Sequence, residues 1–438
     1  MKEKILIIVE NSTLPHDPRV WNEAAALHSA GYQVTILCPR GKTHSTDSYE
    51  LRDGIHIYRH PLPQEGRSTR GVLWEYLCAI FWQVLYSWWI FLRRGFHLIQ
   101  ACNPPDDIVL VALPFKVLGV RFIFDHHDAS PELYLAKYGR RDILYQMLLW
   151  MEKVTFVCSD VVISTNESYK EIAIKRGGCK PENVFVVRNG PDLGRCQPVA
   201  PNDSLRHGKR YLVGYVGVMG KQDGLDLLID VAEYIRKLGN NDIYFICIGG
   251  GPELHDLQEA VKQKNLSDMV CFTGRIPDAE MLEILSTADV CVNPDRPCEM
   301  NNISTMIKIM EYMALMKPIV QYDFKEARVS AGDASLYCSK EQGIVDFANK
   351  ILWLLDHPEE RIRMGDRGRK RVEESLLWEY SVPKLLAAYD AAFGRCDSAT
   401  LEDKKVLAPN DNEIPRDACE TSCIAPDETS TNKSILSR

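Results

Sequence analysis

The sequence predicts an α/β protein with two doubly wound domains, each a parallel sheet covered by helices on both faces. Short β-branched runs that are apolar throughout alternate with helical stretches in both halves, which is typical of parallel strands. A polar segment rich in Gly and Pro, residues 189–209, separates the two series and indicates a linker. Because such folds bind ligands at the carboxyl ends of their strands, we expect a cleft between the domains.

Size and composition fit this fold class. The chain has 438 residues, enough for two domains and a tail. Its net charge of −8 argues against a general nucleic-acid-binding protein, because a phosphate backbone requires a basic surface. The 14 cysteines are scattered and form no zinc quartet. The first apolar run, 5–9, lacks the features of a signal peptide, so we expect a cytoplasmic protein with reduced thiols.

The first half contains a repeated strand–helix pattern. Its first helix begins after Asp17, a capping residue, with Pro18 in the first turn, and Gly31 follows its last turn. Repetition of this unit predicts a doubly wound sheet. The expected strands are 5–9, 33–38, 55–58, 98–101, 121–124, 161–164 and 184–187.

The aromatic segment 72–93 admits three interpretations. Glu75 and Gln83 interrupt its apolar run, which disfavours a membrane-spanning helix. A buried or partly exposed helix of the first domain is the simplest interpretation. The third is a helix lying in the plane of a membrane. Its residues at headgroup level would then be Trp82, Trp88, Trp89, Arg93 and Arg94.

The second half repeats the pattern and ends in a polar tail. Helices are expected at 225–238 and 306–315, with helical patterns from 340 to 393. The expected strands are 211–216, 244–248, 270–272, 290–292 and 318–321. The predicted divisions are a first domain at 1–195 joined by a returning helix at about 378–394, a second domain at 208–377, and a disordered tail at 396–438.

The most informative segment reads NNISTMIKIMEYMALMKPIV. As a helix beginning near Ser304, it would place Ser304, Lys308 and Glu311 on one stripe. Amides of Ser304, Thr305 and Met306 would face an anion, and Lys308 would add a positive charge. Glu311 can accept hydrogen bonds from a ribose diol. The alternative is a surface pair between Lys308 and Glu311.

Two other segments have the composition of ligand-binding turns. GYVGVMGKQDG at 214–224 follows a strand, and GGGPE at 249–253 is a similar turn.

DHHDASPELY also follows a strand and predicts a polar site around His126 and His127. A metal site is the alternative there. Adjacent histidines point in opposite directions on an extended chain, which counts against shared coordination.

These segments together resemble the family 4 retaining glycosyltransferases of the GT-B fold, over nearly the whole chain to about residue 393. Their order and spacing carry the resemblance. The matching motifs are HDPRVWNEAAAL at 16–27, FDHHDASPELY at 124–134, RNGPD at 188–192, FTGRIPDAEMLEILSTADVCVNP at 272–294 and KIMEYMALMKPIV at 308–320. The resemblance implies two Rossmann-like domains facing across a cleft.

On the donor side, the resemblance implies that Glu311 holds the ribose and that Ser304, Thr305 and Met306 bind the distal phosphate. The other implied donor-binding residues are Gly217, Gly220 and Lys221 in the glycine loop, Arg275 and Ile276 beside the nucleobase, and Lys308. The leaving diphosphate would be neutralised by Lys221 and the segment at Ser304 without a metal. No Asp-X-Asp motif is evident, and no cofactor is implied.

On the acceptor side, the resemblance places His127 near the donor sugar and the acceptor. We expect the catalytic residues to be His127, Lys221 and Glu311. The loop from Asn11 to Arg19 would face the acceptor, although the glycine pair usual in this loop is absent. The implied acceptor-side residues are Asn11, His16, Arg19, His127 and Asp128.

One departure from the family pattern concerns the donor sugar. The family places a second glutamate eight positions before Glu311, where this sequence has Ile303. An isoleucine cannot bind a sugar hydroxyl. The alternative suppliers of that contact are Asn302 and Glu299.

The resemblance implies a retaining transferase that moves a sugar from a nucleotide-diphosphate sugar, UDP preferred and GDP as the alternative. The acceptor would be a glycan or a lipid-linked molecule in cell-surface or extracellular polysaccharide synthesis. A peripheral contact with the inner membrane face is compatible with the aromatic segment. Two rival functions are a catalytically silent nucleotide-sugar-binding protein, which Ile303 favours, and a nucleotide-sugar epimerase.

Overall fold

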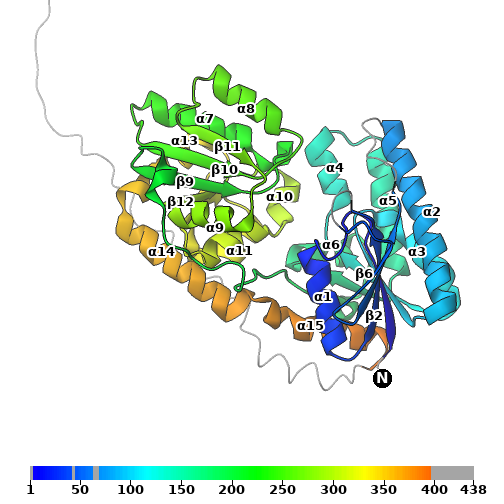
Figure 1. Cartoon of the computed structure of the whole chain (residues 1–438). Coiled ribbons are helices and arrows are strands. Elements are labelled where there is room, and N and C mark those ends of the chain that lie inside the picture. The colour runs from blue at the N-terminus through cyan, green and yellow to red at the C-terminus, as the bar shows by residue number, and fades with distance from the viewer. Residues whose placement is uncertain (1–2, 42–44, 63–68, 396–438) are drawn as a thin grey trace, which may run out of the picture. The chain divides into compact units, whose positions relative to one another are not determined.

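The computed structural model describes residues 3–41, 45–62 and 69–395, which contain two sheets with helices packed around them (Figure 1). Both sheets are parallel apart from one edge hairpin. The predicted α/β class with two doubly wound domains is therefore confirmed. The tail at 396–438, predicted to be disordered, lies outside the described residues.

The first sheet has the strand order β3-β4-β2-β1-β5-β6-β7-β8. Its strands are β1 (Lys4–Ile8), β2 (Gln33–Pro39), β3 (Tyr49–Arg52), β4 (Ile55–His60), β5 (Leu98–Cys102), β6 (Arg121–His126), β7 (Val161–Ser164) and β8 (Val184–Val186). Strand β3, which pairs antiparallel with β4, was not predicted from the sequence. Asp53 and Gly54 both have positive φ between these strands, so the Asp-Gly pair was the available hairpin signal.

Successive residues of β1 supply two separate cores, as expected for a strand covered on both faces. Ile5 and Ile7 pack with α1 (Pro18–Ser29) and α15 (Trp378–Ala392). Leu6 and Ile8 pack with α2 (Thr69–Arg94), α3 (Val109–Val117) and α5 (Ile143–Cys158). The remaining helices of this domain are α4 (Ser130–Tyr138) and α6 (Glu167–Lys175). The last helix of the described residues, α15, thus packs on the first sheet.

The second sheet has the strand order β11-β10-β9-β12-β13-β14. Its strands are β9 (Tyr211–Val216), β10 (Ile243–Ile248), β11 (Val270–Gly274), β12 (Val290–Asn293), β13 (Ile319–Tyr322) and β14 (Ser335–Cys338). Its helices are α7 (Leu225–Lys237), α8 (Leu254–Gln263), α9 (Asp278–Thr287), α10 (Glu299–Ile303), α11 (Ile307–Ala314), α12 (Lys325–Ala331), α13 (Gly343–Asp356) and α14 (Pro358–Arg371). The short edge strand β14 was not predicted.

Short helical turns complete the described chain. Five are 3₁₀ turns and one is a π turn. They are Asp106–Ile108, Pro181–Asn183, Asp203–Arg206, Lys221–Asp223, Gly332–Ala334 and, as the π turn, Val372–Leu376. None of the helices in the described part of the chain has the length and apolar character needed to cross a membrane.

Candidate donor and acceptor sites

The glycine turn after β9 is shaped by close packing against the glycine turn after β10. Gly217 N donates to Ile248 O at 3.0 Å, and Met219 N donates to Gly250 O at 3.2 Å. A Cβ on Gly251 would lie 2.4 Å from Met219 O. The two glycine-rich turns therefore contact each other through their backbones. They can meet because the second turn follows the next strand along the chain.

The loop that carries Lys221 is fixed to α10 by a buried asparagine. Lys221 is exposed and begins the 3₁₀ turn Lys221–Asp223. Asn301 Nδ2 donates to Gln222 O at 2.9 Å and to Arg296 O at 2.8 Å. Asn301 thus holds the turn containing Lys221 beside the segment that leads into α11. Asn301 was not predicted as a site residue from the sequence.

The helix predicted to begin near Ser304 begins instead at Ile307. Ser304 ends α10, because its Oγ donates to Met300 O at 2.7 Å, and the backbone at Ser304 and Met306 is extended. The amides of Ser304, Thr305 and Met306 therefore precede α11 rather than forming its first turn, and that part of the prediction is wrong. Of the three residues predicted to share one helical face, only Lys308 and Glu311 lie on α11.

The segment before α11 lies against the first domain. Asn166 Nδ2 donates to Ile303 O at 2.9 Å and to Thr305 Oγ1 at 3.0 Å. Tyr169 OH and Ser304 Oγ lie 3.2 Å apart. Ser304 and Thr305 are thus located where the start of α6 meets the second domain.

Three polar contacts hold the Asn301–Tyr312 segment against the end of β9. Asn301 bonds the Lys221 turn, Val216 N donates to Tyr312 OH at 2.9 Å, and Lys308 Nζ lies 3.5 Å from Tyr215 OH. Lys308 also pairs with buried Asp295 at 2.8 Å. Its charge is therefore already matched by a carboxylate.

Glu311 is engaged by an arginine of the interdomain linker. Arg195 Nη1 lies 3.1 Å from Glu311 Oε1, while the same guanidinium bonds Asp278 at 2.7 and 3.0 Å. Burial raises the pKa of Glu311, and the positive charge of Arg195 opposes that rise. A ligand hydroxyl that binds Glu311 must share it with Arg195 or displace Arg195. Arg195 was not predicted as a site residue from the sequence.

The two residues expected beside a nucleobase follow β11. Arg275 is exposed, and a Cβ on Gly250 would lie 3.5 Å from its Cγ. Ile276 is partly buried and packs against the core of the second domain. Both residues come shortly before Asp278 in the sequence. Asp278 pairs with Arg195, which also contacts Glu311.

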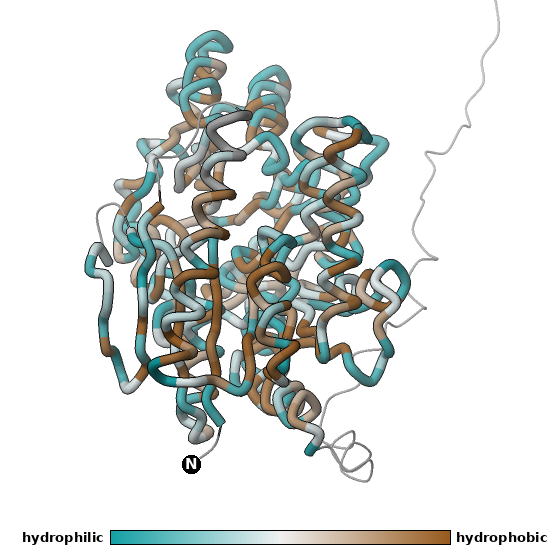
Figure 2. The backbone as a smooth tube through the Cα atoms, turned by 90° about the vertical axis from the view of Figure 1, so that its right-hand side faces the viewer, coloured by the Kyte–Doolittle hydropathy of each residue, from teal (hydrophilic) through white to brown (hydrophobic). Residues whose placement is uncertain are grey.

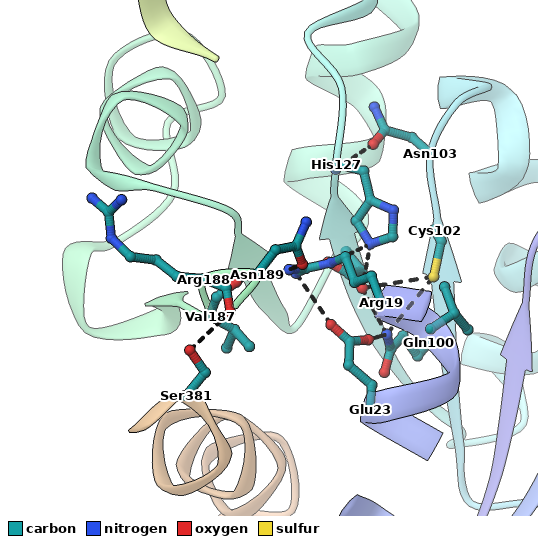
Figure 3. Close-up of polar contacts among 12 residues, drawn as sticks. Arg19, Glu23, Gln100, Cys102, Asn103, His127, Val187, Arg188, Asn189 and Ser381 are labelled. Atoms are coloured by element: carbon teal, nitrogen blue, oxygen red, sulfur yellow. Dashed lines mark hydrogen bonds and ion pairs between the residues drawn. The ribbon is translucent and has the colours of Figure 1, made fainter. Parts of the chain in front are cut away.

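On the first domain, Arg19 organises the ends of several strands (Figure 3). Arg19 Nη2 pairs with Asp125 Oδ1 at 2.9 Å, and Arg19 Nε lies 2.7 Å from His127 Nε2. Arg19 Nη1 donates to Asn189 Oδ1 at 2.7 Å and to Val187 O at 2.8 Å. The structure thus brings together two of the predicted acceptor-side residues, Arg19 and His127.

A buried polar network continues beneath this arginine. Gln100 Nε2 donates to Glu23 Oε2 at 2.6 Å and to Asp125 Oδ2 at 2.8 Å, and Gln100 Oε1 accepts from Tyr389 of α15. Burial and the charge of Asp125 raise the pKa of Glu23. Burial alone would raise the pKa of Asp125, but the charges of Arg19 and His127 hold it well below its usual range.

The main chain of His127 and Asp128 is clamped by Asn103. Asn103 Oδ1 accepts from His127 N at 2.6 Å and from Asp128 N at 3.1 Å. Its Nδ2 donates to Asp128 O and to Asp106 Oδ1, both at 2.7 Å. Burial raises the pKa of Asp106 to about 7. Asn103 therefore determines how His127 is presented at the end of β6.

The other expected acceptor-side residues have less defined places. Asn11 and His16 are exposed in the loop after β1, and His16 Nε2 lies 3.3 Å from Ser45 Oγ. Asp128 is half-buried, and burial raises the pKa of its carboxyl. The roles of Asn11, His16 and Asp128 stay predictions.

Cys102, Asp125 and His127 are the described residues whose ligand atoms come within 4.8 Å of one another, as a metal site would require. Arg19, however, contacts both Asp125 and His127 and supplies the positive charge at this position. Burial and the nearby carboxylates raise the pKa of Cys102, which disfavours the thiolate that binds metals. The residues present therefore fit an arginine-centred network better than a cation.

His126 points away from His127, as alternation along an extended strand requires. Its ring packs on Phe156 and Tyr169, with centroids 5.1 and 4.9 Å away, and its Nε2 lies 3.9 Å from Glu152 Oε1. Burial, helped by the charge of Arg176, lowers the pKa of His126 to about 3. His126 is therefore a neutral core residue and does not share a site with His127.

The buried neutral His126 gives stability a defined pH dependence. Between pH 3 and about 6.5 the unfolded chain binds a proton at this position and the folded chain does not, so the free energy of unfolding falls as pH is lowered. We expect His126→Gln to remove up to about 1.4 kcal/mol per pH unit from the slope in this window. Urea unfolding measured between pH 4 and 7 checks this.

The pH dependence of the variant's free energy of unfolding is compared with that of wild type because Glu152 also contributes to it. Burial raises the pKa of Glu152 to about 8, so its contribution changes with pH in the opposite direction. The matched control is His255→Gln, at an exposed histidine of α8. Equal slopes for wild type and His126→Gln would contradict the assignment of a neutral His126.

Two family models match the chain and together cover most of its length. The model described as Glycosyl transferase 4-like domain matches residues 17–190, and the model described as Glycosyl transferases group 1 matches residues 197–371. The first match contains the helix with Arg19 and the strand end with His127. The second contains the glycine turns, Glu311 and α11.

Curated and solved relatives agree with these matches. The 2-deoxystreptamine glucosyltransferase of Streptomyces kanamyceticus is 23% identical over 78% of this chain and 89% of its own. Sucrose-phosphate synthase of Thermosynechococcus elongatus superposes with a TM-score of 0.73 at 19% identity, over 90% of this chain and 100% of the other. HepE of Anabaena, solved with UDP and glucose, gives 0.67 at 15%, over 89% and 100%. This chain belongs to the group 1, family 4 type of glycosyltransferases and has the GT-B fold.

Proposed function

We propose that this glycosyltransferase moves a sugar from a nucleotide-diphosphate sugar, with UDP preferred over GDP, and retains the anomeric configuration. The observation that carries the proposal is the attachment of α10 and α11 to the end of β9. Contacts of Asn301, Lys308 and Tyr312 place the segment from Ser304 to Glu311 beside the glycine turn and Lys221. HepE of Anabaena, a structural neighbour, was solved with UDP-glucose, which supports a nucleotide-sugar donor.

In the proposed mechanism, the ribose hydroxyls displace Arg195 and bind to Glu311. The diphosphate lies between the extended segment at Ser304 and the side chain of Lys221. Exposed Lys221 is better suited to neutralise the leaving diphosphate than Lys308, whose charge is matched by Asp295. This stabilisation needs no metal ion and no cofactor.

The acceptor side of the proposed site is the end of β6. His127 orients the donor sugar or the acceptor, because Arg19 fixes its ring and Asn103 fixes its main chain. We propose a glycan or lipid-linked acceptor in cell-surface or extracellular polysaccharide synthesis. A lipid-linked acceptor is compatible with a cytoplasmic enzyme that contacts the inner membrane face.

The missing glutamate at Ile303 favours one rival, a nucleotide-sugar-binding protein without transferase activity. Asn302 Oδ1 accepts from Lys325 N at 3.1 Å, so this side chain already caps α12. Glu299 is exposed at the start of α10 and remains the better candidate for the sugar contact. Donor binding measured by calorimetry, with no product from a panel of acceptors, would support the rival. An epimerised donor formed without acceptor would support an epimerase.

A thermal-shift screen tests the donor. We expect UDP-sugars to raise the unfolding temperature more than GDP-sugars do, because a ligand that binds only the folded state stabilises it. NMR of the product anomer tests retention. Stabilisation by neither nucleotide class would contradict the proposed donor site, and an inverted anomer would contradict the proposed mechanism.

Lys221→Ala tests the proposed phosphate contact. The side chain is exposed, so the change leaves the core intact, and loss of a charged hydrogen bond to phosphate should lower kcat/KM for the donor by roughly tenfold. The matched control is Lys262→Ala, at an exposed lysine of α8. Steady-state kinetics with varied donor measures the effect, and equal kcat/KM in both variants would remove Lys221 from the site.

A further inference from the structure

Helix α2 is apolar on its outward face as well as on the face that packs against the core. The exposed residues from Leu77 to its end are Leu77, Phe81, Leu85, Trp89, Leu92 and Arg93, and the first five share one helical face. The polar side chains Gln83 and Ser87 are fully buried instead, and Gln83 Nε2 donates to Glu10 at 3.3 Å. A surface helix of a globular protein normally has polar side chains on its outward face.

The neighbouring helices extend this apolar face. Helix α3 contacts both α2 and α5, and the side of the first domain that carries α2 in Figure 1 is turned toward the viewer in Figure 2, where brown residues are interspersed with paler ones. The outward residues of α3 and α5 include large apolar side chains at helical spacing. These are Leu110, Val117, Ile143, Met147, Trp150 and Val157. We call the exposed apolar residues of these three helices the α2–α5 face.

The charges on and beside the described α2–α5 face are mostly positive, although Arg140 pairs with Asp142 at 2.9 Å. The chain carries a net charge of −8, yet none of the exposed side chains described on α2, α3 and α5 is acidic. Exposed basic residues border the face: Arg93 at the end of α2, Arg140 and Arg141 before α5, and Lys153 within α5. Arg93 lies over the ring of Trp89, 4.8 Å from its centroid. Arginine beside tryptophan is typical of the headgroup level of a membrane.

We infer that the α2–α5 face docks on the surface of an anionic phospholipid bilayer. Apolar side chains would enter the acyl boundary while the bordering arginines and lysine meet lipid phosphates. A protein partner would need hydrogen-bonding groups, about one per 100–200 Å² of interface. The described outward residues of α2 offer almost none, because Gln83 and Ser87 are turned inward. The sign of the bordering charge matches an anionic lipid. This inference does not depend on the proposed sugar transfer.

The inference is tested by flotation of the full-length protein with vesicles of phosphatidylcholine, with and without phosphatidylglycerol. We expect flotation with the anionic vesicles, weakened by added salt. Phe81 and Leu85 are 60% and 49% exposed, so Phe81→Asp with Leu85→Asp leaves the core intact. The double variant should partition at least about tenfold more weakly. The control Ile362→Asp, at a residue 66% exposed on α14, should float like wild type.

Three results would overturn the inference. They are failure of the wild-type protein to float, equal flotation of the double variant and wild type, and a wild-type dimer in analytical ultracentrifugation that the double variant dissociates. The last result would assign the face to a second copy. Circular dichroism and the unfolding temperature confirm that each variant is folded.

Discussion

Replacing Glu311 with Ala should raise the dissociation constant of the nucleotide-sugar roughly 30-fold, which corresponds to loss of about 2 kcal/mol from hydrogen bonds between a carboxylate and the ribose. Glu311 lies on α11 and is engaged by Arg195 at 3.1 Å. Removing the carboxylate leaves Arg195 bonded to Asp278 and leaves the ribose without its acceptor. Calorimetric titration with UDP and with the preferred UDP-sugar measures the effect.

Two further variants separate binding from folding. Glu311→Gln keeps the shape and one acceptor oxygen, so it should bind the donor with intermediate affinity. The matched control, Glu280→Ala, removes an exposed carboxylate from α9 and should bind like wild type. Unchanged affinity of folded Glu311→Ala would mean that the ribose lies elsewhere.

Arg19→Met should destabilise the protein by about 3–5 kcal/mol, since it leaves the carboxylates of Asp125 and Glu23 buried without their cation. The same change removes the group that fixes the ring of His127, so transfer should fall even at temperatures where the variant is folded. Urea unfolding gives the stability, and kinetics on the folded fraction give the activity.

The control for this experiment is an arginine in an exposed ion pair. Arg328 pairs with Asp323 on the surface, so Arg328→Met should cost less than about 1 kcal/mol. Adding Asp125→Asn to Arg19→Met should recover part of the lost stability, because one unpaired charge disappears. Similar stability of Arg19→Met and Arg328→Met would contradict the proposed role of the buried network.

The sequence predicted the fold well because strand runs in a parallel sheet are apolar throughout and short. It missed β3 and β14, which are edge strands of four residues with weaker apolar character. It placed the start of α11 near Ser304, three residues too early. Periodicity continues through Ser304, and only the hydrogen bond from its Oγ to Met300 O shows that one helix ends there.

Candidate site residues such as Arg19, His127 and Glu311 could be named where a family motif contains them, and their roles stay predictions. The residues that hold them in place could not be named. Arg195 lies 116 residues from Glu311, and Tyr389 lies 289 residues from Gln100. Such partners meet only after folding, and neither an arginine in a polar linker nor a tyrosine in an amphipathic helix has a distinctive local pattern.

The bond between Tyr389 and Gln100 has a consequence for where this chain can be shortened. The first domain is completed by a helix that follows the second domain in the chain, so Arg19, Asp125 and His127 acquire their full setting only after synthesis reaches α15. A fragment ending after the second sheet would keep that sheet and still lack the helix that completes the buried polar network of the first domain. Shortened versions should therefore retain the chain through residue 395.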